Sequence, residues 1–172
     1  MKSHNGMRPQ DILILLKIIS LNKKPFYLKN LSFELNISQS EVTESVNRSV
    51  LGGLLAADKK TVMRQAFYDF LVYGLPHVFP QKPGAMLPGM PTAHSAAPLA
   101  KAFKSDELYV WPDIKGNVRG QKIEPFHQGQ IQAAKNDSFL YELLALCDAL
   151  RVGKVREKKM AEEELKKRIL KK

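Results

Sequence analysis

The sequence is poor in several features that would assign it to a well-defined class of protein. It has one cysteine, Cys147, which cannot form an internal disulfide, and we expect this thiol to pack in the core of a protein from a reducing compartment. No apolar run reaches the roughly 18 residues that a membrane-spanning helix requires. Residues 1–6 have no apolar stretch followed by a cleavage site, so we expect no secretion signal. These absences favour a cytoplasmic protein without a membrane partner.

Motifs that carry chemistry are also scarce. The four histidines are scattered without metal-ligand spacing, and one cysteine does not complete a zinc site. Neither a phosphate-binding nor a dinucleotide-binding glycine loop occurs. His94 suggests acid–base chemistry, but no pattern supplies its orienting partner or a nucleophile. We therefore expect no enzyme, no catalytic residues, no metal and no cofactor.

The formal net charge of +10 is concentrated at the two ends of the chain. Residues 1–60 carry nine basic and five acidic side chains, residues 61–150 carry eight of each, and residues 151–172 carry ten basic and four acidic side chains. A polyanion would therefore be attracted to both ends and not to the middle. Basic charge alone is a weak indication, because many basic faces are only solvated.

The N-terminal part has the pattern of a helix-turn-helix domain. Apolar residues at helical spacing predict a helix over 9–21 and a shorter one over 28–36, followed by the tight turn 36–38. Ser38 is expected to cap a third helix, with Glu41 three residues later as in an S-x-x-E capping box.

One face of this third helix is expected to contact DNA. Val42, Val46 and Val50 pack towards the second helix, which leaves the other face of the recognition helix, 39–51, free to enter a major groove. Polar side chains there can bond base edges or phosphates. That face carries Gln39, Ser40, Thr43 and Asn47, with Glu44 and Arg48 towards its rim. Phosphate contacts are expected beside the second helix, from Lys23, Lys24, Tyr27 and Lys29.

A structural or protein-binding three-helix module would show the same apolar spacing. Glu41 and Glu44 make the third helix slightly acidic, which counts against DNA binding, although a capping role explains Glu41 without reference to DNA. RNA binding is disfavoured because aromatic residues are not interleaved with basic ones.

The phrase ISQSEV at 37–42 and the later LGGL at 51–54 make the stretch 11–55 similar to the helix-turn-helix of winged-helix regulators of the MarR type. This resemblance implies a homodimer whose DNA-facing residues are Ser38, Gln39, Ser40, Thr43, Asn47 and Arg48. The chain departs from that family after Leu55. Residues 56–60 lead directly into a predicted fourth helix over 61–73, so the wing is missing, very short or displaced.

Residues 76–136 contain eight of the ten prolines, and we expect a long irregular segment packed on the core. Short strands are expected at 108–111 and 118–123. Tyr109 and Trp111 either anchor this segment or form a peptide-binding surface. The stretch 87–99 also resembles a motif of uncharacterised helix-turn-helix proteins, some of which are encoded beside toxins, and this implies an antitoxin-like role.

Residues 137–172 are predicted to form two helices that break at Gly153 and end in a basic tail. Three interpretations of the last helix stay open. It is self-paired and solvated, it dimerises through an apolar stripe, or its basic residues contact phosphates. The stripe consists of Val155, Ala161, Leu165 and Ile169.

Together these patterns predict a mainly α protein with a (winged) helix-turn-helix domain at 1–75, a Pro-rich irregular segment at 76–136 and C-terminal helices at 137–172. The leading hypothesis is a homodimeric, sequence-specific transcriptional regulator of double-stranded DNA. The alternative is an antitoxin-like interaction module that binds a toxin through residues 76–125. That alternative predicts an exposed apolar patch larger than a few hundred Å² along the segment.

Overall fold

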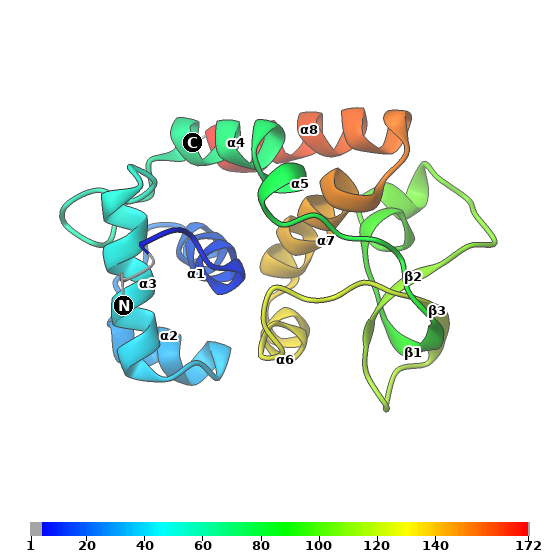
Figure 1. Cartoon of the computed structure of the whole chain (residues 1–172), viewed down its shortest axis with the longest axis horizontal. Coiled ribbons are helices and arrows are strands. Elements are labelled where there is room, and N and C mark those ends of the chain that lie inside the picture. Colours follow the sequence, from blue (N-terminus) through cyan, green and yellow to red (C-terminus); the bar gives the residue numbers. More distant parts are fainter. Residues whose placement is uncertain (1–4, 172) are drawn as a thin grey trace.

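The computed structural model describes residues 5–171, which are mainly helical with one small three-stranded sheet (Figure 1). Residues 1–6, in which we expect no secretion signal, lie largely outside this described part. The helices α2 and α3 lie at one end of the molecule and the sheet at the other, with α7 between them. Within residues 5–171 no helix is both long and apolar enough to cross a bilayer.

The three N-terminal helices form where their apolar spacing predicts them. They are α1 (Pro9–Ser20), α2 (Leu28–Leu35) and α3 (Gln39–Leu51). α1 is buried from Asp11 to Ile19, because α3 packs on it from one side and α7 (Ser138–Val152) from another. Asn36 ends α2 with φ 51°, a left-handed conformation that asparagine adopts more readily than most residues. The short turn that follows sets α2 and α3 against each other.

Residues 54–63 form a short antiparallel turn and not the start of a helix. Leu55 pairs with Val62, and the Ala56 amide donates to the Thr61 carbonyl at 2.8 Å. Asp58 closes the tip by accepting hydrogen bonds from the Lys60 and Thr61 amides. The prediction of a helix from residue 61 was therefore wrong by three residues, since α4 (Arg64–Tyr73) begins only after the second arm of this turn. The two arms of this turn are very short and are joined by the single bridge between Leu55 and Val62.

The Pro-rich segment is more ordered than its composition indicates. After the single turn α5 (Leu75–Val78) it contains β1 (Met86–Pro91), β2 (Tyr109–Pro112) and β3 (Val118–Lys122), which pair with one another. β1 runs antiparallel to both partners, and β2 is parallel to β3. The two expected strands are confirmed, whereas β1 was not expected. At Gly89 a Cβ would lie 2.0 Å from the Trp111 carbonyl oxygen, so the close approach of β1 and β2 requires glycine there.

A buried polar cluster attaches this segment to α7. The Asp148 carboxylate is fully buried and accepts hydrogen bonds from Trp111 Nε1 at 2.6 Å and Thr92 Oγ1 at 2.7 Å. Its other oxygen accepts from the Arg151 guanidinium at 2.8 Å. Trp111 is itself fully buried and Tyr109 nearly so. The anchoring role of these aromatics is therefore confirmed, and the alternative of a peptide-binding surface made by them is wrong.

The C-terminal helices are α6 (Gln130–Asn136), α7 and α8 (Val155–Leu170). Ala161, Leu165 and Ile169 of α8 are fully buried, because α8 packs on α7 and α4. Val155 is 84% exposed and lies apart from them. The apolar stripe is thus used within the chain, so the interpretation that α8 dimerises through it was wrong. Cys147 lies in the core as expected, and burial raises the pKa of its thiol.

Candidate nucleic-acid interface

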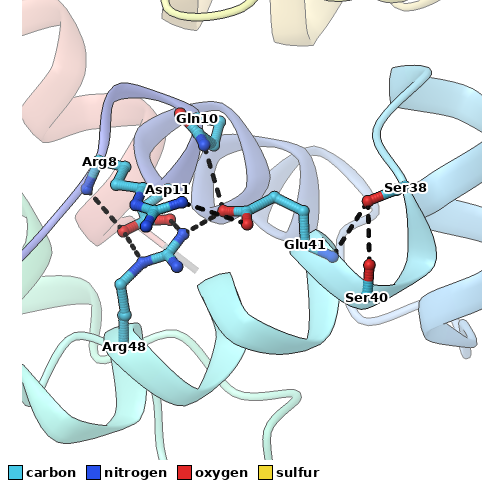
Figure 2. A network of polar contacts seen from close by, with 7 residues as sticks. All are labelled: Arg8, Gln10, Asp11, Ser38, Ser40, Glu41 and Arg48. Carbon is cyan, nitrogen blue, oxygen red and sulfur yellow. Dashed lines mark hydrogen bonds and ion pairs between the residues drawn. The ribbon is translucent and has the colours of Figure 1, made fainter. Parts of the chain in front are cut away.

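The start of α3 is fixed by Ser38. Its hydroxyl oxygen accepts a hydrogen bond from the Glu41 amide at 3.2 Å, which satisfies one of the free N–H groups of the first turn. In a complete capping box the Glu41 carboxylate would bond back to the Ser38 amide. Here it accepts hydrogen bonds from the side chains of Arg48 and Gln10 instead (Figure 2). Glu41 therefore joins α3 to α1.

The two faces of α3 differ sharply. Val42, Ser45, Val46 and Ser49 are buried against α1 and α2. The opposite face is polar, and no other described element covers it. Its exposed side chains are Gln39, Ser40, Glu44 and Asn47, with Ser38 at the N-terminal end and Thr43 partly exposed. Thr43 Oγ1 donates to the Gln39 carbonyl at 2.9 Å, and its oxygen keeps its capacity to accept a hydrogen bond. Five of the six residues predicted to face DNA are thus brought together.

Arg48 is the sixth, and its prediction needs correction. Its side chain is only 9% exposed and lies between α3 and α1. Two of its nitrogens bond the fully buried Asp11 carboxylate, at 3.0 and 2.7 Å, and one of them also bonds Glu41. The hydrogen bonds that Arg48 donates to the Asp11 carboxylate raise the pKa of Arg48, so it remains a cation. In this arrangement Arg48 holds α3 against α1 and does not face solvent.

The contacts of Glu41 bear on the expectation that acidic residues on α3 count against DNA binding. Burial opposes ionisation of Glu41, but the hydrogen bonds from Arg48 and Gln10 outweigh it and lower the pKa of this carboxyl. Arg8 also lies 3.4 Å from Glu41. The charge of Glu41 is therefore balanced by neighbouring cations inside the protein. Glu44 is the acidic side chain that remains on the exposed face.

The side chains that the sequence predicts to contact phosphates are all exposed. Lys23, Lys24 and Lys29 are exposed, and Tyr27 is 77% exposed. Sequence reasoning missed Lys59 and Lys60, which are exposed at the tip of the 54–63 turn. The apolar residues Leu54, Leu55 and Val62 on either side of Asp58 are the signal that would have revealed this turn.

The other sequence candidates do not assemble a second site of this kind. Exposed large apolar residues within 76–125 are Val78, Met86 and Ile114, which come from separate elements. His94 is buried, with its Nε2 at 2.7 Å from the Glu107 carbonyl. No group of three metal-ligating side chains occurs within residues 5–171.

Comparison with protein families, with curated proteins and with solved structures finds no match for this chain.

The Ser38 cap gives a first testable prediction. Ser38→Ala is expected to lower the free energy of unfolding by about 1 kcal/mol, because the Glu41 amide in the first turn of α3 loses its acceptor. Urea denaturation followed by circular dichroism measures this. Ser138→Ala is the matched control, since Ser138 is exposed in the first turn of α7. Equal stability of the two variants would show that the cap does not position α3.

Proposed function

We propose that the protein is a sequence-specific regulator that binds double-stranded DNA and inserts α3 into a major groove. The observation that carries the proposal is the division of α3 into a buried face of valines and serines and an uncovered polar face. The amides of Gln39 and Asn47 can each bond an adenine edge in two places, and the hydroxyls of Ser40 and Thr43 can bond bases or phosphates. The helix is narrow enough for the groove and is braced from behind by the Arg48 network.

Exposed basic residues next to α2 and in the 54–63 turn support the proposal. Lys24 and Lys29 lie beside α2, and Lys59 and Lys60 lie at the tip of the 54–63 turn. Lys24 and Lys60 line the same hollow, and these positions suit contacts to duplex phosphates. We further propose that the 54–63 turn acts as a short wing and that the regulator binds its operator as a homodimer.

Fluorescence anisotropy tests this function directly. Labelled duplexes from the region upstream of the gene, and scrambled duplexes of equal composition, are titrated over a salt series. We expect the upstream duplex to bind more tightly and its affinity to fall linearly with the logarithm of salt concentration. The double variant Gln39→Ala, Asn47→Ala is expected to lose at least about tenfold of the affinity for the upstream duplex, because each well-placed base contact contributes about 1–3 kcal/mol. Binding to scrambled DNA is expected to stay unchanged.

The matched control is Gln65→Ala, Asn117→Ala, which removes the same two amides from exposed positions on α4 and beside the sheet. It is expected to bind like the unmodified protein. Equal affinity for both duplexes, unaffected by either double variant, would contradict the proposal and would leave the helix-turn-helix as a scaffold.

A further inference from the structure

A second feature of the surface lies where three distant segments meet. The turn after α1, the loop before α4 and the C-terminal end of α8 enclose a groove of ≈ 1080 Å³. Six basic residues line it and no acidic one does. They are Lys23, Lys24, Arg64, Lys167, Arg168 and Lys171.

Three of these cations are already engaged by neighbours. Arg64 donates to the Ile169 carbonyl at 2.8 Å, Arg168 bonds Glu142 and Glu164, and Lys167 lies 2.8 Å from Glu164. For Lys23, Lys24 and Lys171 no ion pair is found among residues 5–171. The Asp137 carboxylate, which accepts a hydrogen bond from Ser20 of the groove wall, is also bonded to Lys17. The groove therefore holds three ammonium groups whose charge the protein does not balance.

A smaller hollow of ≈ 260 Å³ continues from the basic groove. Its apolar wall includes Ile18, Pro25 and Phe26, and Lys60 adds a further basic side chain. The two spaces share six lining residues, so they are continuous. The shared residues are Ile19, Lys23, Lys24, Thr61, Val62 and Arg64. A site in which an aromatic ring and an aliphatic wall lie beside ammonium groups suits a ligand that has both a flat ring and several negative charges.

Phosphate fits the charged end better than carboxylate does. The Arg168 guanidinium, which could hold a carboxylate in a two-point contact, is occupied by Glu142 and Glu164, and Arg64 donates through one nitrogen to the Ile169 carbonyl. The remaining lysines bind anions as point charges, which is how lysine holds phosphate. One carboxylate would balance only one of them, whereas a polyphosphate can balance all three.

We propose that this groove is a binding site for a nucleoside polyphosphate, with the ring in the hollow beside Phe26 and the phosphates along Lys23, Lys24 and Lys171. The site does not depend on the DNA-binding function. Phosphates of a bound duplex are the other source of the same chemistry, since Lys23 and Lys24 also flank α2. The experiment therefore contains a free-nucleotide arm and a DNA arm.

Isothermal titration calorimetry of the full chain with ATP, inorganic triphosphate and adenosine tests the site. ATP is expected to bind more tightly than triphosphate, which lacks the ring, and than adenosine, which lacks the charge. The variant Lys23→Glu, Lys24→Glu is expected to lower the affinity for ATP by at least about tenfold, because two charge-assisted hydrogen bonds are lost. The control Lys101→Glu, Lys104→Glu makes the same change in net charge at exposed positions far from the groove and is expected to leave ATP binding unchanged.

The same protein samples are titrated with duplex DNA. Absence of ATP binding by the unmodified chain overturns the groove proposal, and so does equal ATP affinity in both charge-reversal variants. If the Lys23, Lys24 variant loses DNA binding while the unmodified chain does not bind ATP, the groove contacts duplex phosphates and the nucleotide site is wrong. If ATP binds as expected and DNA does not, the groove proposal stands and the regulator function fails.

Discussion

Replacing Asp148 with alanine is expected to lower the free energy of unfolding by about 3–5 kcal/mol, because it leaves a buried cation without its partner. Arg151 bonds Asp148 through two nitrogens, and its side chain is only 4% exposed. The substitution also removes the acceptor of the Trp111 indole and the Thr92 hydroxyl, both buried. Urea denaturation followed by tryptophan fluorescence measures the loss, since Trp111 is the single tryptophan.

Asp106→Ala is the control for this substitution. Asp106 is exposed in the loop before β2, and its removal is expected to change stability by less than about 0.5 kcal/mol. Arg151 also donates to the carbonyls of Phe79 and Glu124 and lies 4.4 Å above the Phe126 ring. The loss of Asp148 should therefore loosen the whole Pro-rich segment. A loss below about 1 kcal/mol would show that the segment is held by apolar packing alone.

Arg48→Ala is expected to destabilise the protein by about 3–5 kcal/mol, because the fully buried Asp11 carboxylate loses its charged partner. DNA affinity of the fraction that remains folded is expected to fall less than it does on loss of Gln39 and Asn47, since Arg48 does not lie on the exposed face of α3. Denaturation curves and DNA titrations on the same samples separate the two effects.

Replacing both members of the pair supplies the control. In the double variant Asp11→Leu, Arg48→Met, no buried charge is left unpaired at this position, and it is expected to be more stable than Arg48→Ala by about 2 kcal/mol or more. Glu41 keeps its contacts with Arg8 and Gln10 in this variant. If Arg48→Ala instead retains full stability and abolishes DNA binding, then Arg48 turns outward to the duplex and its structural assignment is wrong.

The helices at the two ends of the chain follow from the sequence alone. The apolar spacing in α2 and α3 indicates which face is buried, whereas α1 and α7 are buried nearly all round. Ser38 and Asp137 mark where α3 and α7 begin, because each accepts a hydrogen bond from an amide three residues later. These are local effects, because a cap and an amphipathic face depend on residues within one or two turns. The polar face of α3 could be predicted for the same reason.

Tertiary structure alone decided the rest of the site. Arg48 is a long side chain that is compatible with solvent or with an ion pair, and its partner Asp11 lies 37 residues away, so no local pattern could choose between them. β1 contains two prolines that argue against a strand, yet it forms because Gly89 lets it approach Trp111 closely. The basic groove joins residues 23–24, 64 and 167–171. Its charge is concentrated only when α8 packs against α4 and α7, which depends on the apolar stripe of α8 being buried within the chain.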